Sequence, residues 1–236
     1  MLFRSLKFDH SPYIDLPRAK QVNTPSGRRY QTPDGNVYPS ITTVLADQPE
    51  KKKAIAEWRA RVGEAEANKI AKQSARRGTD LHNLLESYIQ GDNEYLKDVM
   101  PSTIDRFRLV QKCLDENLQM VYASETPMYS DILRIAGTAD LICEWNGEVT
   151  VIDFKTARKM KTSDMITDYF IQATAYSIMF EEHTGIECHH FAILMVSDEG
   201  EFQAFHGKRN DYIRQLIRIR DQYEWRKSLD NQRQTA

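Results

Sequence analysis

Cysteine is scarce in this sequence of 236 residues. Its three cysteines, Cys113, Cys143 and Cys188, lie far apart and form no C-x-x-C pair. This spacing gives no sign of a disulfide framework, and three thiols cannot supply four ligands to an iron–sulfur cluster. We therefore interpret them as buried or idle thiols in a reducing compartment.

Long hydrophobic runs are also absent. No apolar run approaches the roughly 20 residues that a membrane-spanning helix needs. Residues 1–10 have neither a sustained apolar core nor a small-residue cleavage site, so they do not resemble a signal peptide. We therefore expect no membrane association, and we predict a cytoplasmic protein, in the host cytoplasm if the source is viral.

The chain lacks the excess of positive charge that nucleic-acid-binding proteins often carry. Its formal net charge is −2, so any interpretation that involves nucleic acid must rest on local basic patches. Hydrophobic residues make up 41% and charged residues 28% of the chain, a composition that argues against global disorder. We expect one globular domain over residues 1–236.

Local signals divide this domain into three portions. Residues 1–37 are rich in turn signals and predict a small hairpin around Arg28-Arg-Tyr-Gln31. Residues 38–120 are mainly helical by their apolar spacing, and residues 121–236 alternate strand and helix patterns. Helices are predicted over 50–73, 74–90 and from Pro101 onward in the second portion, and over 164–183 and 208–228 in the third. Strands are predicted over 121–129, 132–145, 148–155, 189–197 and 201–206. The order favours an α/β domain with a helical N-terminal portion.

Two carboxylates and an ammonium group lie in the strand patterns around the turn signal Asn146-Gly147. Asp153 and Lys155 are two residues apart, so they share a face of their strand. The turn folds the preceding strand back, and the register can bring Asp140 close to Asp153. Two converging carboxylates form a hard oxygen site suited to Mg²⁺ or Mn²⁺, and Lys155 can meet negative charge on a phosphate. The alternative is a simple salt bridge on the strand.

Other side chains extend this candidate site. His82 lies at the edge of the apolar stripe of its predicted helix and can be a further metal ligand. Glu86, one turn on, can orient its ring, and Glu125 can reach the site from the first strand. Each has an ordinary structural alternative: a satisfied boundary histidine, a solvated acid or an edge residue.

Gln172 and Tyr176 are four residues apart on one face of the next helix. An amide and a phenol can both hydrogen-bond a phosphate or a water molecule, although boundary packing explains them equally well. A basic tract containing Arg158, Lys159 and Lys161 follows the candidate site directly, where a phosphate backbone would pass.

Taken together, these residues resemble the PD-(D/E)XK nuclease superfamily, and within it the RecB-like exonuclease branch. Gly78-Thr-Asp-Leu-His82 is similar to the helical Gly-x-x-x-His motif, and Gly137-Thr-Ala-Asp140 to the Gly-x-x-Asp motif. Ile152-Asp-Phe-Lys-Thr156 resembles the Asp/Glu-x-Lys motif, and Gln172-Ala-Thr-Ala-Tyr176 the Gln-x-x-x-Tyr motif. Pro39-Ser-Ile-Thr-Thr-Val-Leu45 extends the resemblance toward the mitochondrial genome maintenance exonucleases and related phage exonucleases.

The resemblance implies a restriction-endonuclease-like core, with a mixed central β-sheet flanked by helices. It implies Mg²⁺ or Mn²⁺ held by His82, Asp140 and Asp153, with the Phe154 backbone carbonyl as an extra ligand. Lys155 would then assist phosphodiester hydrolysis, while Gln172 and Tyr176 hold the phosphate. The DNA contacts expected beside this site are Arg77, Thr156, Arg158, Lys159 and Lys161.

The resemblance further implies a metal-dependent exonuclease whose substrate is DNA with free ends, often single-stranded. The four-cysteine iron–sulfur cluster of some relatives has no counterpart here. One alternative is a nucleic-acid-binding or assembly protein that keeps a nuclease scaffold without cutting. Another is a metal hydrolase for small phosphoesters.

Overall fold

The computed structural model describes residues 7–11, 14, 16–24 and 27–234. Residues 25–26 of the turn-rich stretch fall outside these residues, as does most of the chain start on which the signal-peptide prediction rests. Within the described part, every helix is too short or too polar to span a bilayer.

A six-stranded mixed sheet forms the centre of the molecule, in the order β1-β5-β6-β7-β8-β9. Strand β1 runs parallel to β5, the pairs β5–β6 and β6–β7 are antiparallel, β7 runs parallel to β8, and β9 returns antiparallel to β8. The strands are β1 (Asp9–His10), β5 (Leu118–Ser130), β6 (Ile135–Trp145), β7 (Glu148–Ala157), β8 (His190–Ser197) and β9 (Phe202–Lys208). The predicted mixed sheet is therefore confirmed.

The turn between β6 and β7 is built from the two residues that signalled it. Asn146 has φ 53° and Gly147 has φ 83°, the pair of positive angles that a tight hairpin turn requires. It sets a register in which Leu141 lies opposite Ile152. Residues 152 and 154 enter one apolar core and Val151 enters another, as alternation along a strand demands.

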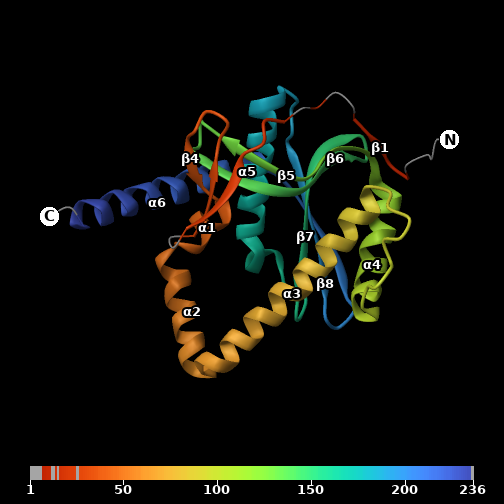
Figure 1. Cartoon of the computed structure of the whole chain (residues 1–236), viewed down its shortest axis with the longest axis horizontal. Coiled ribbons are helices and arrows are strands. Elements are labelled where there is room, and N and C mark those ends of the chain that lie inside the picture. The colour runs from red at the N-terminus through yellow and green to blue at the C-terminus, as the bar shows by residue number, and fades with distance from the viewer. Residues whose placement is uncertain (1–6, 12–13, 15, 25–26, 235–236) are drawn as a thin grey trace.

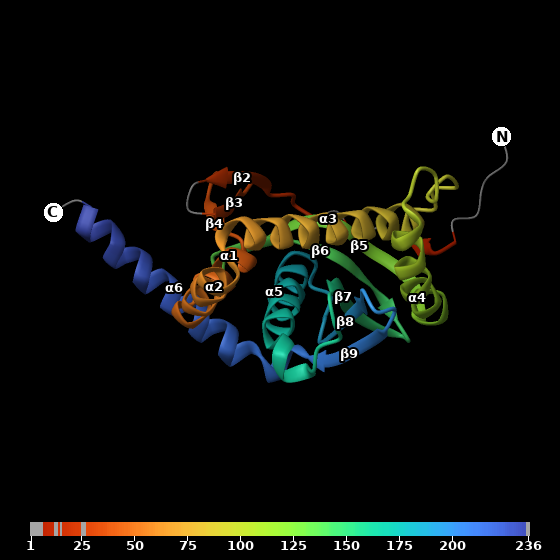
Figure 2. The same ribbon diagram turned by 90° about the horizontal axis from the view of Figure 1, so that it is seen from below.

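Helices cover both faces of this sheet. On one face, α3 (Glu64–Ile89) and α4 (Pro101–Asn117) bury an apolar core against the strands. On the other, α5 (Thr167–Thr184), α6 (Ile213–Gln234) and α1 (Ile41–Ala46) enclose a second core. Figure 2 shows β7 and β8 between α5 and α4, with α3 lying across them. This layering is that of a restriction-endonuclease-like fold.

A small antiparallel sheet precedes the helices, in the order β2-β3-β4. Its strands are β2 (Lys20–Thr24), β3 (Gly27–Gln31) and β4 (Val37–Pro39), which confirms the predicted hairpin. Ser40 caps α1 by accepting a hydrogen bond from the Thr43 backbone N–H at 3.0 Å. A bridge between Ser40 and Ala136 joins this unit to β6.

The predicted helix boundary near residue 73 is wrong. The chain forms α2 (Pro49–Val62) and then α3, and the break lies at Gly63, whose φ is 86°. A left-handed angle is easy for glycine and interrupts the helix there, whereas residues 64–89 continue as one helix. Figure 1 shows α2 and α3 meeting in a sharp V at this point. Two other helices begin later than predicted, because short 3-10 turns (Ser163–Ile166 and Arg209–Asp211) precede α5 and α6.

Candidate active site

The two aspartates lie where β6 and β7 separate. The last residues paired between these strands are Leu141 and Ile152, and Asp140 and Asp153 follow them directly. Beyond this point the Phe154 backbone N–H donates instead to Asp140 Oδ2 at 2.8 Å. The Asp140 side chain thus links the two strands where their backbone pairing ends. Both carboxylates are buried at this point.

Asp153 is fully buried and is paired with Lys155. The Lys155 Nζ atom lies 2.5 Å from Asp153 Oδ2. The other oxygen, Oδ1, is buried and has no hydrogen-bond partner among the described residues. A buried carboxylate oxygen without a donor is costly unless a cation serves it.

His82 reaches the aspartates from α3. Its Nε2 lies 2.8 Å from the Phe154 carbonyl oxygen, which can accept a hydrogen bond from this nitrogen. Its Nδ1 therefore faces the carboxylates, at 3.6 Å from both Asp140 Oδ1 and Glu125 Oε1. α3 passes over β7 at Gly78, where an added Cβ would make only an ordinary contact, 3.8 Å from Thr156 Oγ1.

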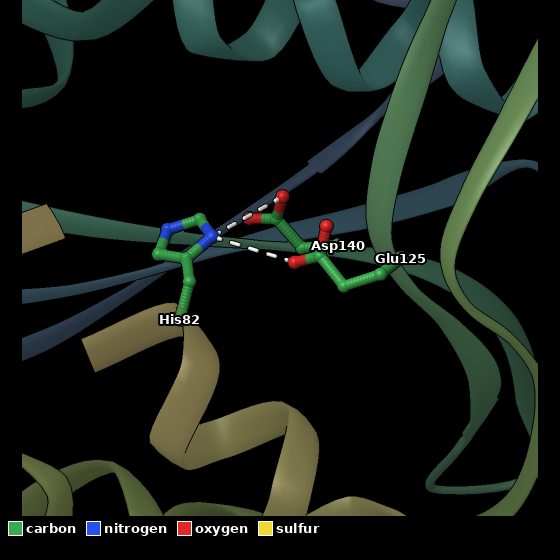
Figure 3. A group of neighbouring side chains, drawn as sticks. All are labelled: His82, Glu125 and Asp140. Atoms are coloured by element: carbon green, nitrogen blue, oxygen red, sulfur yellow. Dashed lines mark ion pairs between the residues drawn. The ribbon is translucent and has the colours of Figure 1, made fainter. Parts of the chain in front are cut away.

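Glu125 completes a tight group with His82 and Asp140 (Figure 3), in which one ligand atom from each residue lies within 4.8 Å of the others. Glu125 has φ 44°, a left-handed angle that is unfavourable for a residue with a Cβ. Strain of this kind persists where the surroundings enforce it, and functional sites are such places. The bend directs the carboxylate toward His82.

The charges of this group shift one another. Burial opposes the charged His82 ring, but the neighbouring Glu125 and Asp140 carboxylates outweigh it and raise the pKa of His82 to about 9. Burial raises the pKa of Asp153 to about 6, against the opposing effect of Lys155. Burial also raises the pKa of Asp140. Three carboxyl groups (Glu125, Asp140 and Asp153) thus contact two basic groups (His82 and Lys155), and a bound cation would balance the excess of acidic groups.

Gln172 and Tyr176 lie on the face of α5 that covers the aspartates. The Gln172 side-chain amide donates to the Tyr176 hydroxyl at 3.1 Å, and both residues are buried. Burial raises the pKa of Tyr176 well above its usual range, so the phenol stays a neutral donor. Gly137 makes room for this ring: a Cβ there would lie 2.6 Å from Tyr176 Cε1.

We expect Gly137→Ala to destabilise the protein by about 1–3 kcal/mol, because the added methyl group forces the packed Tyr176 ring to move. The midpoint of urea unfolding measures this loss. Gly78→Ala is the matched control, since its Cβ would meet only an ordinary contact at 3.8 Å. It should keep or slightly raise stability, because alanine is the better helix former. Equal midpoints for wild type and Gly137→Ala would contradict this packing.

Sequence reasoning missed Tyr169, which lies one turn before Gln172 on α5. The ring centroid of Tyr169 is 5.0 Å from Lys155 Nζ and 5.3 Å from Lys161 Nζ. Lys161 Nζ also donates to the Tyr169 hydroxyl at 3.2 Å. The ring thus contacts both amines, of which Lys155 is the one paired with Asp153. Its spacing from Gln172 and Tyr176 was the available signal, since residues three and seven apart share a helix face.

The other predicted residues lie around the site with different partners. Glu86 lines the same pocket but accepts a hydrogen bond from Gln90 at 3.0 Å, and the His82 ring contacts Glu125 instead. Arg77 Nε lies 3.5 Å from Asp198 Oδ1, and Lys159 Nζ lies 3.7 Å from Glu199 Oε1. Arg158 is exposed, and Thr156 and Lys161 are half-buried. The contacts of these basic residues with DNA stay a prediction.

The candidate site lies in a cleft of about 380 Å³ between α3, α5 and the sheet. Its lining includes His82, Glu125, Asp140, Lys155, Gln172 and Tyr176. Five polar residues to which sequence reasoning gave no role in the site also line the cleft: Arg28, Thr42, Thr79, Asn83 and Thr138. Two of them belong to the N-terminal unit and reach the site only through tertiary packing.

The donor set fits a divalent metal ion. Carboxylate oxygens suit Mg²⁺ and Mn²⁺, and an imidazole nitrogen tilts the preference toward the latter. His82, Glu125 and Asp140 already converge, and Asp153 Oδ1, which has no hydrogen-bond partner among the described residues, adds a further oxygen nearby. The Phe154 carbonyl accepts from His82 here, and its role as a ligand stays a prediction.

Comparison with known proteins bears on this geometry. Residues 119–223 match the PD-(D/E)XK nuclease superfamily. The match covers the strands that carry Asp140, Asp153 and Lys155 and the helix that carries Gln172 and Tyr176. It confirms the resemblance that the motifs indicated.

Individual relatives are distant. The human (Homo sapiens) protein named Mitochondrial genome maintenance exonuclease 1 is 29% identical over 171 residues, which are 69% of this chain and 48% of that protein. The chain thus spans about half the length of this curated relative. Among solved structures, an unconfirmed exonuclease of Eubacterium rectale aligns over 64% of this chain and 65% of its own, with 12% identity and a TM-score of 0.44. The protein SSO0001 aligns over 65% and 69%, with 16% identity and a TM-score of 0.36.

Proposed function

We propose that this protein is a metal-dependent nuclease that hydrolyses phosphodiester bonds of DNA, acting as an exonuclease on strands with free ends and preferring single strands. The observation that carries the proposal is the convergence of His82, Glu125 and Asp140 within 4.8 Å. These groups adjoin a buried Asp153–Lys155 pair. The superfamily match and the distant exonuclease relative support a nuclease. We further propose that the protein acts in the cytoplasm.

Each side chain has a role that its surroundings support. His82, Asp140 and Asp153 would hold Mg²⁺ or Mn²⁺, with Glu125 as a fourth ligand. The bound ion would supply Lewis-acid stabilisation of the phosphate and a more acidic water molecule. Lys155 pairs with Asp153 Oδ2 and leaves Oδ1 for the ion. Its amine would orient the attacking water and stabilise developing negative charge on the phosphate.

The α5 face would bind the substrate. The Gln172 amide and the neutral Tyr176 hydroxyl offer hydrogen-bond donors to a phosphate oxygen above Asp140. Tyr169 keeps Lys155 and Lys161 near this point through its ring face and hydroxyl. Gln172 and Tyr176 are buried and Lys155 and Tyr169 are half-buried, which strengthens the charge interactions among them.

The test is a time course with fluorescently labelled DNA in Mg²⁺, in Mn²⁺ and in EDTA. We expect linear single strands to be shortened progressively from an end, circular single strands to survive, and EDTA to stop all cleavage. A labelled mononucleotide ester should be a poor substrate. Binding without cleavage in either metal would favour the scaffold function instead, and cleavage in EDTA would contradict the metal requirement.

A further inference from the structure

Arg28 is a positively charged residue in the lining of the active-site cleft. It lines the same cleft as His82, Asp140 and Lys155, although it belongs to β3 of the N-terminal sheet. Its side chain is exposed. Among the described residues, no hydrogen bond or ion pair involves its guanidinium group.

The backbone of Arg28 is held firmly. Its carbonyl oxygen accepts hydrogen bonds from the Ser40 N–H at 2.9 Å and the Thr43 hydroxyl at 3.2 Å. Gly27 beside it has φ 118°, and a Cβ there would lie 2.7 Å from Thr43 Cγ2, so the strand packs closely on α1. The backbone is therefore placed by α1 while the guanidinium remains available.

The neighbouring tyrosine shows where this face of β3 points. Tyr30 is two residues on, so it shares a face with Arg28. Its ring is fully buried and its hydroxyl lies 3.0 Å from Thr138 Oγ1 on β6. Thr138 in turn is two residues before Asp140, so the Arg28 face of β3 lies along the stretch of β6 that leads to the aspartates.

The charge balance of the cleft calls for such a cation. Glu86, Glu125 and Asp140 bring negative charge to its lining, and Lys155 is engaged by Asp153 at 2.5 Å. A polyanionic strand entering this cleft is repelled unless further positive charge meets it. Arg28 is the cation of the described lining whose charge is not already matched by a carboxylate.

We propose that Arg28 binds a phosphate of the DNA strand next to the scissile one, and so fixes the position of the strand across the cleft. The inference rests on the proposed nuclease function. A guanidinium group can hold two phosphate oxygens at once. Arg28 contacts a phosphate that does not react, so it contributes to substrate binding and leaves the chemical step to the residues on the sheet and α5.

The kinetic test compares Arg28→Ala, Arg28→Lys and the control Lys20→Ala. Lys20 pairs with Gln31 across β2 and β3, which places it on the opposite face of the same small sheet. We expect Arg28→Ala to raise KM for a single-stranded oligonucleotide about 10- to 100-fold, the effect of one charge-assisted hydrogen-bonded contact, while kcat stays within about 3-fold. Arg28→Lys should recover part of the loss, and Lys20→Ala should match wild type.

Neutral methylphosphonate linkages then identify the phosphate. Introduced singly along the oligonucleotide, one of them should raise KM of wild type by the amount that Arg28→Ala does, and should have no added effect in Arg28→Ala, because both changes remove the same contact. If wild type cuts DNA and Arg28→Ala behaves like Lys20→Ala, the Arg28 inference is wrong and the nuclease proposal stands. If wild type neither binds nor cuts DNA, both fall. A loss confined to kcat would also overturn the role in binding.

Discussion

Asp153→Asn should abolish cleavage, with kcat lower by about 10³-fold or more, the scale seen when a central charged group is removed from an active site. Asp153 is fully buried, one of its oxygens has no hydrogen-bond partner among the described residues, and the other pairs with Lys155. Asparagine keeps the size of the side chain but removes the negative charge that both a metal ion and the lysine need.

Metal-induced stabilisation separates this effect from simple damage to the fold. A ligand at about 100 times its dissociation constant raises the free energy of unfolding by about 2.7 kcal/mol. We expect Mn²⁺ to raise the melting temperature of wild type and to leave that of Asp153→Asn nearly unchanged. Asp164→Asn, an exposed change before α5, is the control and should respond like wild type. A normal metal response together with full activity in Asp153→Asn would refute the assignment.

Lys155→Ala should lower kcat by about 10²- to 10³-fold, as expected for the loss of one group that stabilises transition-state charge. Unlike Asp153→Asn, it should retain the metal-induced rise in melting temperature, because the carboxylates remain. Lys155→Met preserves more of the side-chain volume beside Tyr169 and tests whether the loss is chemical or due to packing. Lys53→Ala, at a lysine whose side chain is 79% exposed, is the charge control. A wild-type kcat in both Lys155 variants would exclude a catalytic lysine.

Much of the central fold could be predicted from local signals. Asn146-Gly147 fixed the β6–β7 turn because both residues tolerate positive φ. That turn determines the register, and the register places Asp140 beside Asp153. Alternation then assigned Asp153 and Lys155 to one face of β7. These inferences depend on neighbouring residues in sequence, where the physics is local.

The remaining features depend on packing between distant segments. Glu125 adopts φ 44° within β5, and no residue preference predicts this conformation. Arg28 reaches the cleft because Gly27, Ser40 and Thr43 dock the small sheet on α1. A sequence pattern predicts the secondary structure around a residue. It does not predict which distant segments will pack beside that residue, so it did not place Glu125 and Arg28 in the lining of one cleft.

The break at Gly63 is another feature that the sequence did not predict. Glycine is compatible with helix, turn and cap, and its neighbours on both sides favour helix, so the sequence permits a boundary at several places. The structure places it where Gly63 adopts φ 86°. This choice separates α2 from α3 and allows α3 to run on to His82 as one continuous helix. The position of the histidine thus depends on a boundary that periodicity did not resolve.

The most direct test of the whole account is a crystal of the protein soaked in Mn²⁺ and measured for anomalous scattering. We predict one strong anomalous peak among the side chains of His82, Glu125, Asp140 and Asp153, within coordination distance of their oxygen and nitrogen atoms. The same peak should vanish from crystals of Asp153→Asn. Density with no peak there, or with manganese bound only elsewhere on the surface, would contradict the central claim.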